Sequence, residues 1–115
     1  MDFIKGLITE YRALFTSKKF NICCDETFDL GKGRSKALAD EKGEHALYMA
    51  HVVELCRWLL SQGVTPMFWG DIMWRHPEAY AEIPEGVICL NWGYLPEQRE
   101  NEVRDLAQMG ATQYV

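Results

Sequence analysis

The chain has 115 residues, enough for one domain with one core and too few for a complete eight-stranded βα barrel of about 250 residues. Hydrophobic residues make up 48% and charged residues 25% of the chain, a globular composition that excludes disorder. The net charge of −5 argues against a nucleic-acid partner, because the basic residues form only one small cluster around residues 32–36. No apolar run approaches the roughly 18 residues of a membrane span, so we expect no membrane partner.

The first third of the chain predicts a helix, a strand and a long loop. Apolar residues at helical spacing indicate an amphipathic helix over residues 3–15 with one buried stripe. Its interspersed acidic residues distinguish this segment from a signal peptide. Residues 20–24 form an apolar run whose length suits a buried parallel strand. We expect a loop over residues 27–43, and loops this long in compact domains are usually functional.

The rest of the chain alternates between helix and strand patterns. We expect a helix over residues 44–60 with His51 in the core, strands over 64–69 and 86–92, a short helix over 77–83, a helix over 97–109 and a fourth strand from residue 112. This order contains no hairpin and therefore predicts an α/β fold with a parallel sheet of about four βα units. Because the chain begins with a helix and ends inside a strand, we expect it to be a piece of a longer protein.

The cysteines and histidines lack the spacing of a metal site or a disulfide framework. No CxxC pair occurs among the four cysteines, which are Cys23, Cys24, Cys56 and Cys89. We expect them to be buried free thiols, a use of cysteine that favours a reducing compartment such as the cytoplasm. The histidines are not spaced as metal ligands, and Gly31 and Gly33 lack the third glycine of a phosphate-binding loop. We therefore expect neither a metal nor a cofactor.

Acidic and aromatic side chains follow three neighbouring strands. These are Asp25 and Glu26 after the first strand, Trp69 and Asp71 at the second, and Trp92 and Tyr94 at the third. In parallel α/β folds the carboxyl ends of the strands meet at one rim, where functional groups gather. Each feature alone is also common in solvated loops or cores. Together they predict a carbohydrate site, because aromatic rings stack on sugars and carboxylates bind hydroxyls and exchange protons.

The same segments resemble a known family. Residues 21–26 (Asn-Ile-Cys-Cys-Asp-Glu) followed by 29–34 (Asp-Leu-Gly-Lys-Gly-Arg) resemble the acid motif of glycoside hydrolase family twenty, the β-N-acetylhexosaminidases. Residues 66–73 and 90–94 resemble the next two strands of that family, and the likeness extends over about residues 18 to 115. The resemblance implies about half of a (β/α)8 barrel, with four strands and four helices, so that residues 1–115 form a single partial catalytic domain.

The resemblance also implies a role for each predicted site residue. The substrate would be a terminal β-linked N-acetylhexosaminide whose own 2-acetamido oxygen is the nucleophile. Glu26 would protonate the glycosidic oxygen and then activate water, while Asp25 would hold the acetamido N–H. Trp69 and Trp92 would wall the sugar pocket. Asp71 and Tyr94 are further expected sugar contacts.

One departure from the family and one alternative reading accompany this resemblance. The family often has a glycine pair or another pair of small residues before its Asp-Glu motif, where this chain has Cys23 and Cys24, so the packing beneath the acid pair is expected to differ. The alternative function is a non-catalytic carbohydrate-binding or scaffold α/β domain. In either case the open edges of a half barrel favour self-association, either face to face as four plus four strands or by flattening into a doubly wound sheet. We expect the isolated chain to be inactive, since half a rim cannot enclose a pyranose.

Overall fold

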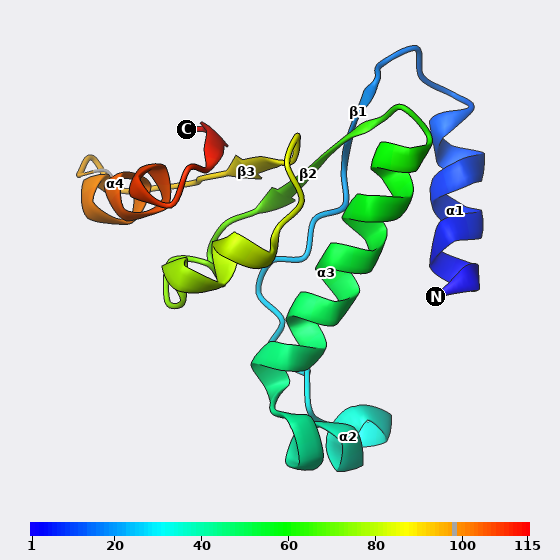
Figure 1. Cartoon of the computed structure of the whole chain (residues 1–115), viewed down its shortest axis with the longest axis horizontal. Helices are drawn as coiled ribbons and strands as arrows, with labels where there is room; N and C mark the ends of the chain where they lie inside the picture. The colour runs from blue at the N-terminus through cyan, green and yellow to red at the C-terminus, as the bar shows by residue number, and fades with distance from the viewer. Residues whose placement is uncertain (98) are drawn as a thin grey trace.

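The computed structural model describes residues 1–97 and 99–115. In chain order the elements are α1 (Asp2–Arg12), β1 (Lys19–Asn21), the 3-10 helix η1 (Gly33–Ser35), α2 (Lys36–Lys42), α3 (Glu44–Ser61), β2 (Thr65–Trp69), the 3-10 helix η2 (Pro77–Glu82), β3 (Ile88–Leu90), α4 (Glu100–Gln108) and β4 (Thr112–Tyr114). Figure 1 shows helices following strands along the chain, with α1 and α3 side by side at one end of the sheet.

The four strands form one parallel sheet in the order β1-β2-β3-β4. The predicted α/β fold with parallel βα units is therefore confirmed. Lys19 on one edge strand donates a hydrogen bond to the Tyr114 hydroxyl on the other edge strand, and its ammonium lies 4.9 Å from the Tyr114 ring centroid. In a flat sheet these edges lie about 14 Å apart with parallel side chains. Contact between them shows that the sheet curves, as a barrel segment does.

The main core lies between α3 and the convex face of the sheet. Phe68 and Cys89 are paired in register on β2 and β3, and neither is exposed. The α3 helix buries six residues against this face and the neighbouring elements, namely Tyr48, Met49, Val52, Leu55, Cys56 and Leu59. Leu106 of α4 closes the same cluster at the other end of the sheet. Alternate burial along β2, with Pro66 and Phe68 inside, follows from the period of two in a strand.

The α1 helix buries much less than its sequence predicts. Of its residues only Ile8 is buried, although a stripe of apolar side chains runs along the helix. The exposed members of that stripe and of the turn that follows are Phe3, Leu7, Tyr11, Leu14 and Phe15. Three of them, Leu7, Tyr11 and Leu14, line a groove of about 510 Å³ between α1 and Phe20 of β1. The prediction of a fully buried stripe was wrong, because within this chain α1 is packed on one side only.

Other predictions need smaller corrections. The expected loop over residues 27–43 contains η1 and α2, and the expected helix over residues 77–83 is the 3-10 helix η2. His51 is exposed on α3 instead of lying in the core, and Cys23 is an exposed thiol. The predicted helix over residues 97–109 includes residue 98, which lies outside the described residues, and the described helix begins at Glu100.

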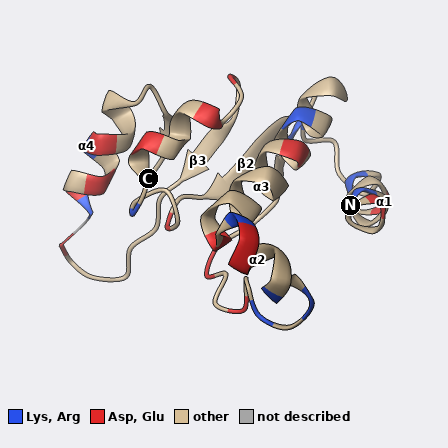
Figure 2. Ribbon diagram, turned by 60° about the horizontal axis from the view of Figure 1, so that its bottom comes forward, with Lys and Arg blue, Asp and Glu red and all other residues tan. Residues whose placement is uncertain are grey.

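Charged residues are distributed over several elements. Figure 2 shows lysine and arginine in separate places around α1, α2 and α4 in this view, with aspartate and glutamate between them. None of the helices in the described part of the chain is long and apolar enough to cross a membrane.

Candidate active site

The turn after β1 has an unusual backbone conformation. Pairing with β2 continues past the strand, since Ile22 donates to the Met67 carbonyl and Cys23 accepts from the Trp69 amide. Cys23, Cys24 and Glu26 then adopt left-handed conformations, with φ of 63°, 65° and 45°. For a residue other than glycine this conformation costs roughly 1–2 kcal/mol. The strain explains why a glycine pair suits the first two of these positions in the motif that the sequence resembles.

Hydrogen bonds from three elements hold this turn. The Asn21 side-chain oxygen accepts from the Cys23 amide at 2.9 Å. The hydroxyl of Tyr48, on α3, donates to the Cys24 carbonyl at 3.0 Å. An oxygen of Asp71, which follows β2, accepts from the Glu26 amide at 3.0 Å. The strained backbone before and at Glu26 is therefore fixed from β1, α3 and the loop after β2, and Tyr48 is a site residue that sequence reasoning missed.

A cavity of about 220 Å³ lies at the carboxyl end of the sheet. It is lined by Glu26, Phe28, Asp71, Trp74, Arg75, Trp92, Arg99 and Glu102, and we call it the acid–indole cavity. It brings together Glu26, Asp71 and Trp92, which follow three different strands. The structure thus gathers one predicted residue from each of the three strand ends in one place.

The other predicted residues lie around this cavity without lining it. Asp25 is half-buried in the strained turn, and Trp69 is half-buried at the end of β2. Tyr94 is 89% exposed, and its ring lies 5.3 Å from the ring of Trp92. Tyr94 therefore extends the aromatic surface outward from the cavity, while Asp25 and Trp69 line neither this cavity nor the one beside it.

A second tryptophan, Trp74, lines the acid–indole cavity beside Trp92 and was not predicted from the sequence. The rings of Trp74 and Trp92 lie 5.2 Å apart, and the Trp74 indole N–H donates to Asn91 at 2.9 Å. The Arg99 guanidinium lies 4.3 Å from the Trp74 ring centroid and 3.4 Å from a Glu102 oxygen. Trp74 falls in a segment without strand or helix periodicity, so only its closeness to Asp71 in the sequence signals a role.

Two buried polar atoms of the acid–indole cavity have no hydrogen-bond partner among the described residues. They are the second carboxylate oxygen of Asp71 and the indole nitrogen of Trp92. Leaving such a group unpaired costs about 1–3 kcal/mol. One atom can accept a hydrogen bond and the other can donate one, and both lie beneath the solvent-accessible surface.

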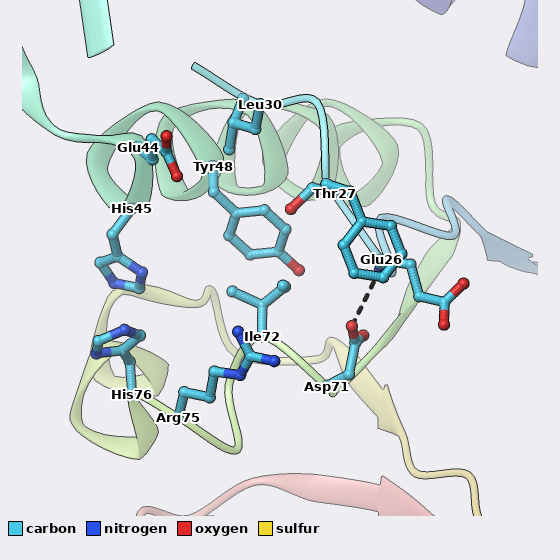
Figure 3. Close-up of a pocket in the computed structure, with 11 residues that line it drawn as sticks. Glu26, Thr27, Leu30, Glu44, His45, Tyr48, Asp71, Ile72, Arg75 and His76 are labelled. Carbon is cyan, nitrogen blue, oxygen red and sulfur yellow. Dashed lines mark hydrogen bonds between the residues drawn. The ribbon is translucent and has the colours of Figure 1, made fainter. Parts of the chain in front are cut away.

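A second cavity of about 310 Å³ adjoins the first. We call it the histidine cavity, and its lining consists of Glu26, Thr27, Phe28, Leu30, Glu44, His45, Tyr48, Asp71, Ile72, Arg75 and His76. The rings of His45 and His76 are 4.5 Å apart at its far end, opposite Glu26 in Figure 3. Glu26, Phe28, Asp71 and Arg75 line both cavities, so the two share a wall.

The thiols beneath the site are unreactive. Burial raises the pKa of Cys24 from 9.0 to about 12, with smaller contributions from Cys23 and the nearby carboxylates. Burial likewise raises the pKa of Cys89 to about 12. These thiols stay protonated near neutral pH and supply no thiolate nucleophile. The described residues contain no group of three or more histidine, cysteine, aspartate or glutamate side chains arranged to hold a metal ion.

Comparison with known proteins supports the fold. Of solved structures, the chain is similar to the crystal structure of a β-N-acetylhexosaminidase from Bacteroides fragilis, with a TM-score of 0.75 and 19% sequence identity. The similarity covers 98% of this chain and 22% of that one, so the chain spans less than a quarter of the length of its structural relative. No protein-family model matches the sequence, and no curated protein matches it significantly. The fold is thus a parallel α/β segment consistent with part of a hexosaminidase barrel.

Proposed function

We propose that this chain forms part of the catalytic barrel of a β-N-acetylhexosaminidase of glycoside hydrolase family twenty. The observation that carries the proposal is the convergence of Glu26, Asp71 and Trp92 on one cavity. The paired indoles of Trp74 and Trp92 suit the apolar face of a pyranose. The likeness to a hexosaminidase fold supports the same assignment.

In the proposed reaction the carbonyl oxygen of the substrate's 2-acetamido group attacks the anomeric carbon. The bond to the leaving group breaks, and Glu26 donates its proton to the departing oxygen. A cyclic oxazolinium intermediate results. Water then attacks the anomeric carbon while Glu26, now a carboxylate, takes up its proton. The product retains the β configuration because two inversions occur.

Other residues support this step in the proposal. Asp25 hydrogen-bonds the acetamido N–H and stabilises the positive charge of the intermediate. Trp92 and Trp74 provide the stacking surface, with Trp69 and Tyr94 as further sugar contacts. Asp71 orients Glu26 through the backbone amide of that residue. The turn that presents Glu26 is already strained and hydrogen-bonded, so little reorganisation precedes catalysis.

The whole domain of such an enzyme would enclose the sugar from all sides. We propose that residues 1–115 are one part of that domain and are inactive alone, because the cavity at Glu26 is small and open on the concave side of a four-stranded sheet. A second candidate is a carbohydrate-binding domain without catalysis. The observation that favours it is Asp25, which does not line the cavity with Glu26.

The test is the Glu26→Gln substitution in the full-length protein that contains this chain. Turnover of aryl and disaccharide β-N-acetylglucosaminides should fall by about two to four orders of magnitude, and most for the poorer leaving groups. Glu85→Gln, at an exposed position outside both cavities, is the matched control and should leave turnover unchanged. Near-normal hydrolysis by Glu26→Gln refutes the catalytic role. Sugar binding without hydrolysis by the unaltered protein supports the second candidate.

A further inference from the structure

We propose that the histidine cavity binds the leaving group of the substrate and selects one that carries an anionic substituent. The shared chemistry is a carboxylate or a sulfate ester on the sugar next to the cleaved bond. This inference rests on the proposed glycosidase function and names the class of substrate on which that site acts.

The position of the cavity follows from the wall that it shares with the acid–indole cavity. Glu26, Phe28, Asp71 and Arg75 line both spaces, so Glu26 stands at their boundary. A residue that protonates the glycosidic oxygen has the cleaved sugar on one side and the leaving group on the other. If the N-acetylhexosamine stacks on the indoles of the first cavity, the leaving group lies in the second. Its volume of about 310 Å³ is at the lower end of ligand pockets, which start at about 300 Å³.

The preference for an anion comes from Arg75. Its side chain is exposed, and its guanidinium makes no ion pair with any described residue. Arg99, the other arginine near Glu26, is instead held by Glu102 and by the Trp74 ring. Figure 3 shows the Arg75 guanidinium inside the ring of lining residues, below the Tyr48 hydroxyl. A free guanidinium binds a carboxylate or sulfate with two parallel hydrogen bonds.

The imidazoles of His45 and His76 provide hydrogen-bonding groups for the hydroxyls of the leaving group. His45 lies on α3 and His76 directly precedes η2, and their ring centroids lie 4.5 Å apart with the ring planes tilted by 45°. Each ring carries a nitrogen donor or acceptor that suits sugar hydroxyls. Tyr48 adds an aromatic surface, although its hydroxyl is already bonded to the Cys24 carbonyl. The cavity therefore combines one free cation with several hydrogen-bonding groups.

Three carboxylates also line the cavity, and each is accounted for. Asp71 accepts a hydrogen bond from the Glu26 amide. The Glu26 carboxylate points away from the histidine pair in Figure 3. Glu44 lies in the first turn of α3, where the positive end of the helix dipole stabilises its charge. None of them forms an ion pair with Arg75.

The inference is tested by nuclear magnetic resonance titration of the 15N-labelled full-length protein that contains this chain, carrying Glu26→Gln so that disaccharides are bound without hydrolysis, with four sugars. These are N-acetylglucosamine alone, and N-acetylglucosamine β-linked to glucose, to glucuronate and to 6-sulfated glucose. We expect the glucuronate or the sulfated disaccharide to bind about tenfold more tightly than the glucose disaccharide, because a charge-assisted hydrogen bond is added. The two acidic ligands identify which anion is preferred. Resonances of His45 and His76 should shift with every disaccharide.

Arg75→Gln should remove the preference for acidic disaccharides and leave the affinity for the neutral one within about twofold. Arg104→Gln, an exposed arginine of α4 that lines neither cavity, is the matched control and should keep the preference. Equal affinity for acidic and neutral disaccharides, or a preference that survives Arg75→Gln, overturns the inference. If N-acetylglucosamine still shifts the Trp92 signal, the proposed function stands without it. Absence of any sugar binding overturns both.

Discussion

The helices α1 and α3 have very different surroundings, and α3 is the more apolar of the two. Both carry apolar residues at helical spacing, yet α3 buries six of its residues and α1 buries only Ile8. They touch through Ile8, which packs with Leu55 and Leu59, and through a hydrogen bond of 2.8 Å from Lys5 to Glu54. Only α3 reaches the site, by means of Tyr48 and its first turn.

This difference shows that an amphipathic pattern predicts an apolar face and does not say what covers it. The face of α3 is covered by the sheet of the same chain, so α3 both stabilises the fold and positions the turn before Glu26. The face of α1 borders an open groove next to the edge strand β1. We therefore expect the residues that stabilise this chain to lie mainly on α3. The exposed apolar residues of α1 are instead available to contact another apolar surface.

The largest expected effect comes from truncating one leucine of α3, compared with one leucine in the turn after α1. Leu55→Ala should lower the free energy of unfolding by about 2–5 kcal/mol, because Leu55 is 1% exposed and its removal leaves a cavity. Leu14→Ala, in the turn after α1, should change it by at most about 0.5 kcal/mol, because Leu14 is 75% exposed. Urea unfolding at a concentration where the chain is monomeric measures both. Equal losses in the two variants would contradict the division between the helices.

The second effect is a loss of stability at alkaline pH that originates in the core. Burial raises the pKa of Cys56, on α3, from 9.0 to about 12, and that of Cys89 likewise. Above pH 9 the unfolded chain therefore loses these protons while the folded chain keeps them, so stability is complete below pH 9 and falls toward pH 12. Each thiol contributes a slope of about 1.4 kcal/mol per pH unit within that window.

Urea unfolding at pH 8, 9 and 10 tests this slope. Cys56→Ala should reduce the slope of the unfolding free energy against pH by the contribution of one buried thiol. Cys23→Ala should reduce this slope less, because Cys23 is exposed. A slope that Cys56→Ala leaves intact would show that the buried thiols do not control it.

The third effect concerns the uncovered face of α1. We propose that the chain self-associates through this face and the open edges of the sheet, since exposed strand edges and apolar faces pair with one another. Sedimentation velocity at micromolar concentration should detect dimers, and Leu14→Asp should raise the dissociation constant about tenfold or more. Arg57→Asp, an exposed position on α3, is the control. A stable monomer for the unaltered chain would contradict the proposal.

The smallest expected effect comes from removing one tyrosine hydroxyl from each helix. Tyr48→Phe removes the hydrogen bond to the Cys24 carbonyl and should cost about 0.5–1.5 kcal/mol of stability. Tyr11→Phe on α1 is the matched control, because Tyr11 is 60% exposed, and its effect should be within about 0.3 kcal/mol. The Tyr48 variant should also shift the amide resonances of residues 23–26. Unchanged resonances there would mean that α3 does not position the turn.

The order of strands and the rim of the sheet were predictable from the sequence because both depend on regular patterns. Strand ends in a parallel sheet share one edge, so Glu26, Asp71 and Trp92 were expected to meet, and they line one cavity. Tyr48 and Trp74 were not predicted. Tyr48 lies on an apolar helical face that reads as core, and Trp74 takes part only through the fold of an irregular loop.

The strained backbone of the turn at residues 23–26 could not be predicted from the sequence either. Nothing in the residue types of Cys23 and Cys24 indicates positive φ, which the tertiary hydrogen bonds impose. His51 shows the opposite error: it follows the helical period of its apolar neighbours and yet lies on the exposed side of α3. The spacing of apolar residues shows which side of a helix is buried. Whether a residue at the margin of that side, such as His51, is buried depends on what packs against it.

The most direct test of the central claim is the indole N–H resonance of Trp92 in the full-length protein that contains this chain, during titration with N-acetylglucosamine and with glucose as the control. The account predicts a saturable shift of the Trp92 signal, accompanied by Trp74 and the Glu26 amide, with a weaker response to glucose because it lacks the acetamido group. The indole of Trp58, on α3 outside both cavities, should stay unchanged. A Trp92 signal that does not respond to N-acetylglucosamine, or that responds equally to glucose, would contradict the account.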